Sequence, residues 1–102
     1  MTGQDLHQLL LNKWGRSYDV QLRRTQGKVF LQVMWKYLEQ ASFPLSEAEY
    51  DLHMEAIATY LNGIGGTLQV QRYILETKER PRLGKAVSIS LDLGDRASEW
   101  IL

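Results

Sequence analysis

The sequence predicts an α+β fold: a small three-stranded, mostly antiparallel sheet with helices packed on one side. Apolar and polar residues alternate in three short segments, which is the pattern of strands with one buried face. In the segments around them, apolar residues recur every three or four positions, which is the pattern of amphipathic helices. Read along the chain, these segments give the order α-β-β-α-α-β-α.

A first helix is predicted over about residues 3–14. Thr2 is a favourable N-cap residue, and Gly15 is well placed to end the helix. Four apolar side chains between them fall on one helical face: Leu6, Leu9, Leu10 and Trp14.

A β-hairpin is predicted to follow. Tyr18, Val20 and Leu22 alternate with polar residues and indicate the first strand. The second strand begins at Lys28 or Val29 and carries apolar side chains on both faces, which is typical of a central strand or a helix-covered edge. In the connection, residues 25–28, a glycine stands where a tight turn needs a positive φ. Three tryptophans fall on predicted buried faces: Trp14, Trp35 and Trp100.

Two helices are predicted in the middle of the chain. Ser46 and Glu49 match a capping box, so the longer helix begins there, and Asn62 and Gly63 are expected to stop it. Thr67 is expected to cap a second, short helix. Apolar residues at helical spacing favour this helix, although residues 68–75 also alternate and would permit a strand.

A basic loop leads into the third strand. Residues 78–85 carry four positive charges and one negative charge, and they contain Pro81 and Gly84. The third strand is expected over about residues 86–92, where apolar residues alternate with polar ones. Asp95 is then expected to cap a final helical turn that closes the core with Trp100.

Length and composition exclude several classes of protein. The 102 residues fit a single domain, residues 1–102, with one core. The chain has no cysteine, which excludes disulfides, thiolate metal ligands and a cysteine nucleophile. No apolar run approaches the roughly 20 residues of a membrane span, and no signal-peptide pattern is present. We therefore expect a cytoplasmic location.

No motif for catalysis, a cofactor or a metal is recognisable. His7 and His53 lie on different predicted helices, and neither has a His or Cys neighbour at ligand spacing. Residues 63–66 are glycine-rich, but they follow a helix, whereas a dinucleotide-binding loop follows a strand. We expect no catalytic, cofactor-binding or metal-binding residues; an enzyme whose site assembles from scattered residues remains an alternative.

Binding signals are stronger than catalytic ones. Six cations would form one basic surface if the third strand lies beside the hairpin: Arg80, Arg82 and Lys85 with Arg23, Arg24 and Lys28. Arginine is suited to bidentate capture of carboxylate or phosphate. The expected ligand is an acidic protein partner, and the alternative is an anionic surface of RNA or lipid headgroups. A net charge of zero weakens the nucleic-acid alternative. A solvated loop that only adds solubility is the plainer interpretation.

Four segments are long and specific enough to compare with known families: WGRSYD (14–19), LQVMWKYLEQ (31–40), FPLSE (43–47) and RPRLGKAVSI (80–89). They resemble an uncharacterised family of small domains of unknown function in cyanobacteria, with related sequences in plant chloroplasts. The resemblance implies a small α+β domain of oxygenic phototrophs, and it supplies no catalytic residues that could be assigned to this chain. With the basic loop, it suggests a non-enzymatic interaction, assembly or regulatory domain, monomeric by default, in the cytoplasm or peripheral to thylakoids.

Overall fold

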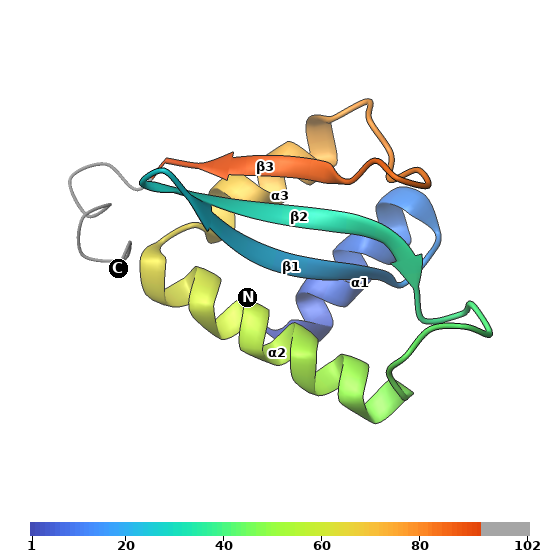
Figure 1. Ribbon diagram of the computed structural model, residues 1–102. Coiled ribbons are helices and arrows are strands. Elements are labelled where there is room, and N and C mark those ends of the chain that lie inside the picture. Colours follow the sequence, from blue (N-terminus) through green and yellow to red (C-terminus); the bar gives the residue numbers. More distant parts are fainter. Residues whose placement is uncertain (93–102) are drawn as a thin grey trace.

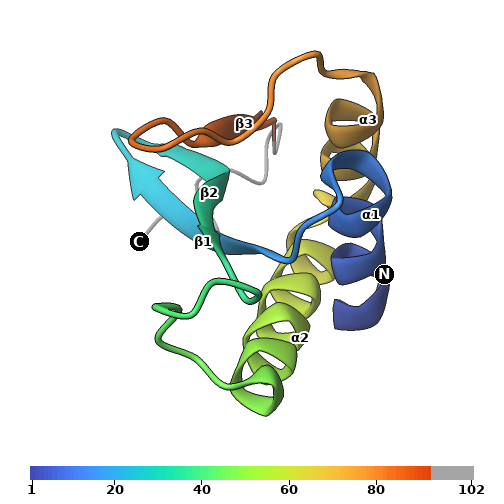
Figure 2. The ribbon, with the colours of Figure 1, turned by 90° about the vertical axis from the view of Figure 1, so that its right-hand side faces the viewer.

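A computed structural model describes residues 1–92, in which one sheet packs against three helices (Figure 1). The elements are α1 (Gly3–Trp14), β1 (Tyr18–Thr25), β2 (Lys28–Tyr37), α2 (Glu47–Ile64), α3 (Thr67–Glu76) and β3 (Val87–Leu91). The strands form one antiparallel sheet in the order β1-β2-β3, and the helices cover one face (Figure 2). The predicted fold is therefore confirmed, except that the expected last helix, with Asp95 and Trp100, lies outside the described residues.

The hairpin between β1 and β2 ends in a two-residue turn. Gln26 and Gly27 have φ angles of 50° and 79°, so both central residues occupy the left-handed region. Paired positive φ values are typical of a type I′ turn, whose twist matches that of the flanking strands. β2 pairs with β1 on one side and with β3 on the other, which confirms it as the central strand.

The core lies between the sheet and the helices. On the helix-facing side of the sheet, Leu31 of β2 is paired with Leu22 of β1 and Ile89 of β3. The helices bury their apolar faces against this layer, each at the predicted positions: Leu6 and Leu10 from α1, Tyr50, Met54 and Leu61 from α2, Val70 and Ile74 from α3. Within residues 1–92, no helix is long and apolar enough to cross a bilayer.

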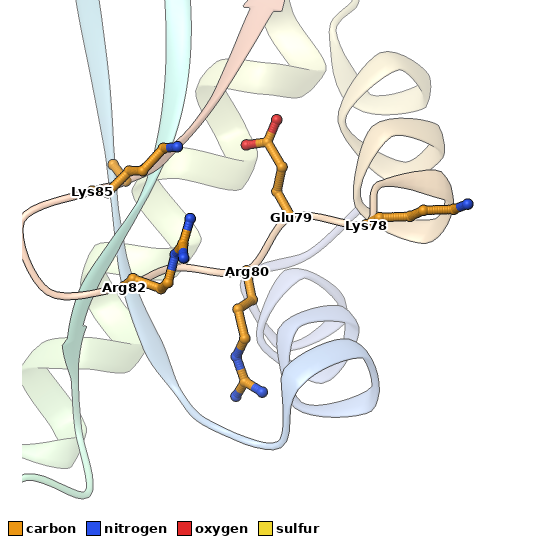
Figure 3. A pocket seen from close by; sticks show the side chains of 6 residues that line it. Lys78, Glu79, Arg80, Arg82 and Lys85 are labelled. Carbon is orange, nitrogen blue, oxygen red and sulfur yellow. The ribbon is translucent and has the colours of Figure 1, made fainter.

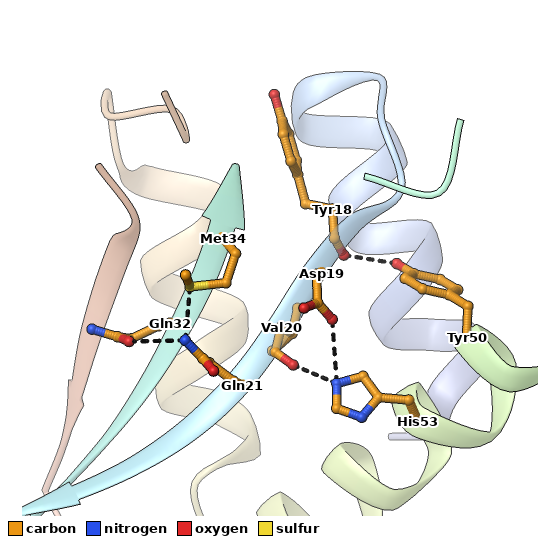
Figure 4. Close-up of polar contacts among 8 residues, drawn as sticks. All are labelled: Tyr18, Asp19, Val20, Gln21, Gln32, Met34, Tyr50 and His53. Carbon is orange, nitrogen blue, oxygen red and sulfur yellow. Dashed lines mark hydrogen bonds and ion pairs between the residues drawn. The ribbon is translucent and has the colours of Figure 1, made fainter. Parts of the chain in front are cut away.

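Helix α2 also covers the outer edge of β1 (Figure 4). The Tyr50 hydroxyl donates a hydrogen bond to the carbonyl oxygen of Tyr18 at 2.9 Å, and His53 Nε2 donates to the carbonyl oxygen of Val20. His53 Nε2 also lies 3.4 Å from an Asp19 carboxylate oxygen. These side chains occupy two carbonyl groups that could otherwise pair with another strand, so α2 closes this edge of the sheet over the first residues of β1.

The caps of α2 follow the prediction at its start and differ at its end. Ser46 and Glu49 form the predicted capping box. The helix does not stop at Asn62 and Gly63, because the following turn still buries Ile64; it ends at Gly65, which has a φ of 74°.

Helix α3 confirms the helical interpretation of residues 67–76 over the strand alternative. Val70 and Ile74 are buried, whereas Leu68 is exposed, which fits a helical face and not an alternating strand. Thr67 is the first helical residue and not the predicted N-cap, a position that Gly66 takes. The Thr67 hydroxyl instead donates a hydrogen bond to Asn62 at 2.9 Å.

Gly3 allows the start of α1 to approach α2 closely. A Cβ atom at this position would lie 2.6 Å from the backbone nitrogen of Glu55. We expect Gly3→Ala to lower the free energy of unfolding by about 1–3 kcal/mol, because the start of α1 must move away from α2 to make room for the added methyl group. Urea unfolding would measure this. The control is Gln4→Ala at the neighbouring exposed position, which should stay within about 0.5 kcal/mol of wild type; an equal loss in both variants would contradict the close-approach argument.

Candidate functional site

The cationic loop, residues 78–85, lines a pocket of about 350 Å³ at the start of β3 (Figure 3). The lining residues are Lys78, Glu79, Arg80, Arg82, Lys85 and Ala86. The structure thus brings together Arg80, Arg82 and Lys85, three of the six cations that the sequence singled out. Figure 3 shows Arg82 and Lys85 side by side, Glu79 on the same side of the loop, and Arg80 directed the opposite way.

Contacts with α1 and a tight turn hold the cationic loop in place. Trp14 Nε1 donates a hydrogen bond to the carbonyl oxygen of Glu79 at 3.1 Å, and Pro81 is buried. Arg82 and Lys85 exchange two backbone hydrogen bonds, of 3.0 and 2.7 Å. Gly84, with a φ of 78°, makes this turn possible. These contacts therefore hold the backbone of the cationic loop in a fixed position.

The positive charges of the cationic loop are not balanced by an equal number of carboxylates nearby. Arg82 and Lys85 form a backbone bridge, so two like charges lie directly opposite each other, an arrangement that costs stability in a sheet pair. Glu79 is the single acidic residue in the pocket lining. Within residues 1–92, no carboxylate lies within 4.0 Å of the charged groups of Arg80, Arg82 or Lys85. An incoming anion would relieve the repulsion between the two cations.

A second hollow, the aromatic hollow, shares Arg80 and Arg82 with this pocket and has a volume of about 470 Å³. Its lining residues are Arg16, Tyr18, Trp35, Tyr37, Gln40, Arg80, Pro81, Arg82 and Leu83. The Arg16 guanidinium lies 4.4 Å from the centre of the Tyr37 ring, and Leu83 at the tip of the turn is 89% exposed. Trp35 is only half-buried and lines this hollow, so the expectation that it faces the core is wrong. The sequence did not identify this hollow, because its aromatic residues are brought together by sheet pairing.

The hairpin cations do not join the cationic loop. Arg23, Arg24 and Lys28 lie next to the turn between β1 and β2. The register pairs Val29 with Leu91 and Val33 with Val87, so β3 ends beside the hairpin turn and begins beside the middle of β2. Four residues of strand separate the two ends by roughly 14 Å. The expected single basic surface is therefore corrected to two separate groups of cations.

Ser17, His7 and Glu39 form a polar network that the sequence did not suggest. Ser17 Oγ lies 2.6 Å from His7 Nε2, and the Ser17 backbone N–H donates to Glu39 at 2.8 Å. Burial acts to raise the pKa of the Glu39 carboxyl, but hydrogen bonds from Ser17 outweigh it and hold that pKa below its ordinary value. In a catalytic triad the acid orients the histidine, whereas here it binds the serine. Ser17 is also only 2% exposed, so the network ties α1 to the strands.

Metal binding finds no support in the part of the chain that the structure describes. Among residues 1–92, no group of three or more His, Cys, Asp or Glu side chains is arranged to hold a metal ion. The His53 imidazole is hydrogen-bonded through Nε2 to the carbonyl oxygen of Val20 at the edge of β1. What the described residues place together is a group of cations on the loop and a set of aromatic side chains beside it.

Comparisons with known proteins agree with the resemblance seen in the sequence. Residues 4–101 match a family described as a domain of unknown function (DUF3067). The chain is also similar to the solution NMR structure of the Alr2454 protein from Nostoc sp. strain PCC 7120, a structural genomics target. That similarity has a TM-score of 0.91 and a sequence identity of 72%, and it covers 100% of this chain and 98% of the other. No curated protein matches the chain. The expected likeness to a cyanobacterial family of unknown function is confirmed.

Proposed function

The chain belongs to the family described as a domain of unknown function (DUF3067), and we propose that it is a non-enzymatic interaction domain for an acidic protein partner. The observation that supports this proposal is the held pair of Arg82 and Lys85 beside Lys78 and Arg80 in one pocket. A pocket whose lining carries four cations and a single carboxylate, Glu79, is suited to an anionic ligand. In an oxygenic phototroph, such a domain would serve assembly or regulation of a protein complex.

The size of surface electrostatic effects favours a ligand with several carboxylates. An exposed ion pair contributes about 0.2–1 kcal/mol, so one carboxylate bound by one exposed cation would be held weakly. Four cations of the cationic loop line the same pocket. Arg82 and Lys85 lie side by side (Figure 3), so a segment with several acidic residues can engage both together, and the contributions of such a network add up to a specific contact.

The charge distribution favours an acidic protein over an extended polyanion. The exposed residues Glu47, Asp51 and Glu55 give α2 an acidic outer face, and the net charge of the chain is zero. RNA or a membrane surface would extend well beyond one loop and meet repulsion from such a face. An acidic peptide segment needs no more surface than the cationic loop and its neighbours. Binding of RNA or lipid headgroups remains the alternative that the experiment below separates.

The test is a charge reversal in the loop, Arg82→Glu with Lys85→Glu, and the probe is an immobilised poly-glutamate peptide. We expect the double variant to lose at least tenfold in affinity, because two attractive contacts become repulsive. The matched control is Arg23→Glu with Lys28→Glu, which makes the same change in net charge at the far end of the sheet. Circular dichroism would confirm that both variants are folded.

Two results would overturn the proposal. Equal losses in the two double variants would mean that net charge, and not the cationic loop, governs retention. Tighter binding to single-stranded RNA or to anionic phospholipid vesicles than to poly-glutamate, lost with the loop variant, would assign the loop to the alternative ligand class. In that case the affinity should fall steeply as salt is added.

A further inference from the structure

The outer edges of β1 and β3 differ in which of their backbone N–H and C=O groups are hydrogen-bonded to other parts of the chain. In an antiparallel sheet, alternate residues direct their N–H and C=O groups to opposite sides of the strand. The Val20 carbonyl points to α2 and away from β2. Its partner Val33 is therefore in a non-hydrogen-bonded pair with β1 and directs its own groups toward β3. Val33 in turn is paired with Val87, which fixes the alternation of β3.

It follows that Val87, Ile89 and Leu91 bond to β2, whereas Ser88 and Ser90 direct their backbone groups outward. One contact verifies this alternation independently. Gln69 of α3 donates to the carbonyl oxygen of Asp92 at 2.6 Å and accepts from its N–H at 2.7 Å. Asp92 belongs to the outward set, and the Gln69 amide pairs with it as a neighbouring strand would.

The outer edge of β3 is therefore closed at one end only. Gln69 occupies Asp92, but within residues 1–92 no hydrogen bond from a side chain or another segment reaches the backbone groups of Ser88 or Ser90. Ala86 continues this edge toward the loop and is also part of the lining of the cationic pocket. An exposed row of N–H and C=O groups is a template for a further strand. On the opposite edge, Tyr50 and His53 occupy the carbonyl groups of Tyr18 and Val20 at the start of β1.

We propose that the acidic segment binds as a fourth strand along the outer edge of β3, with its carboxylates in the cationic pocket. This inference rests on the proposed function and adds a binding mode to it. Main-chain pairing with Ser88 and Ser90 would supply hydrogen bonds that do not depend on sequence, and the pocket would supply specificity. The edge runs from the cationic loop at Ala86 to an aspartate at residue 92. The preferred segment therefore carries its acidic residues at the end that meets the loop and uncharged, extended residues beyond it.

A second copy of the chain is a poorer occupant of this edge. Antiparallel self-pairing would be centred on Ser88 and Ser90, and Gln69 blocks its extension to Asp92. Two residue pairs bury far less than the roughly 800 Å² per partner that a stable complex requires. Such a dimer would also leave the cations of the pocket without carboxylates. Charge complementarity thus favours an acidic segment.

Amide hydrogen exchange of the wild-type protein tests the binding mode directly. The probe is a synthetic peptide of alternating valine and threonine followed by three glutamates, so that its acidic end meets the loop when it pairs antiparallel to β3. We expect the amides of Ser88 and Ser90 to exchange at least tenfold more slowly when the peptide is bound. The amide of Ile89 should change little, because it is already bonded to β2. Changes confined to the amides of residues 78–85 would overturn strand addition and leave acidic capture intact.

A variant pair gives a second measurement. Ser90→Pro removes the outward N–H, and proline is tolerated at such edge positions because no bond within the sheet is lost. We expect about tenfold weaker peptide binding, whereas Ser90→Thr, which keeps the N–H, should bind as wild type does. Equal affinities of the two variants would contradict strand addition; if Ser90→Pro does not fold, the exchange experiment decides. Slow exchange of Ser88 and Ser90 without peptide, with a doubled mass in solution, would instead assign the edge to a second copy.

Discussion

Replacing Leu31 with alanine should lower the free energy of unfolding by about 3–5 kcal/mol. Leu31 is 0% exposed and lies in the middle of the central strand, between Leu22 and Ile89. Neighbours on both strands are held by the backbone ladder, so the site cannot collapse around the missing atoms and a cavity remains. Because domains of this size are stable by only about 5–15 kcal/mol, this loss would remove a large fraction of the total stability.

Urea unfolding followed by circular dichroism measures this loss, and Leu52→Ala is the matched control. Leu52 is 74% exposed on the outer side of α2, and alanine is the better helix former. The same chemical change should therefore alter stability there by no more than about 0.5 kcal/mol. Similar losses at the two positions would mean that burial does not set the cost, and would contradict the placement of the core between sheet and helices.

The elements that could be predicted from the sequence are those whose signals are local. Ser46 and Glu49 are three residues apart, and the hydrogen bonds of the capping box join these two residues directly. Gly15 is a similar case, since a helix end needs one residue with a positive φ and the structure gives it 77°. Period-two alternation predicted the strands because one face of each strand is buried.

The end of α2 shows where local signals become ambiguous. Gly63 and Gly65 can each end a helix, and the sequence alone favoured the first. The outcome depends on Ile64, which is buried against the rest of the core only if the helix continues past Gly63. Tertiary packing of Ile64 therefore decides between the two glycines at which the helix could end.

The candidate site also has a part that local sequence predicts and a part that depends on long-range strand pairing. Arg82 and Lys85 are the ends of one tight turn, so their proximity is a local property that the sequence reveals. Whether Arg23 and Lys28 join them depends on the direction of β3. A parallel β3 would have put Val87 beside Val29 and the cationic loop beside the hairpin turn, but the observed antiparallel pairing puts the loop at the other end. Strand direction is set by contacts far apart in the sequence, which no local pattern encodes.

The open edge of β3 was also beyond prediction from the sequence. Its recognition requires the alternation of backbone groups across all three strands and the contact between Gln69 and Asp92. Glutamine residues in helices are common and carry no local sign of such a role. The binding mode proposed for the edge therefore rests on backbone geometry, whereas the charge of its partner rests on composition. The two can be tested separately for that reason.

The loss of one buried hydroxyl, in Tyr50→Phe, should lower the free energy of unfolding by about 1–3 kcal/mol near pH 8. The hydroxyl donates to the carbonyl oxygen of Tyr18, which would be left without this partner at the edge of β1. The ring contacts with His7 and Phe43 persist in phenylalanine, so packing changes little. The effect should therefore come from the hydrogen bond alone, and Tyr73→Phe, at a half-buried position on α3, is a suitable control.

The same variant should also respond differently to pH. Burial, with smaller contributions from Asp19 and Glu39, raises the pKa of Tyr50 far above its ordinary value of about 10. Because the folded-state pKa is the higher one, the unfolded chain loses this proton first. The contribution of Tyr50 to the free energy of unfolding should thus be fully present below pH 10. Above pH 10 it should decline by up to about 1.4 kcal/mol per pH unit. Tyr50→Phe lacks the group, so the difference between the two proteins should narrow between pH 10 and 11. A constant difference across that range would show that the folded state does not hold Tyr50 in its neutral form, and the closure of the β1 edge by this hydroxyl would have to be abandoned.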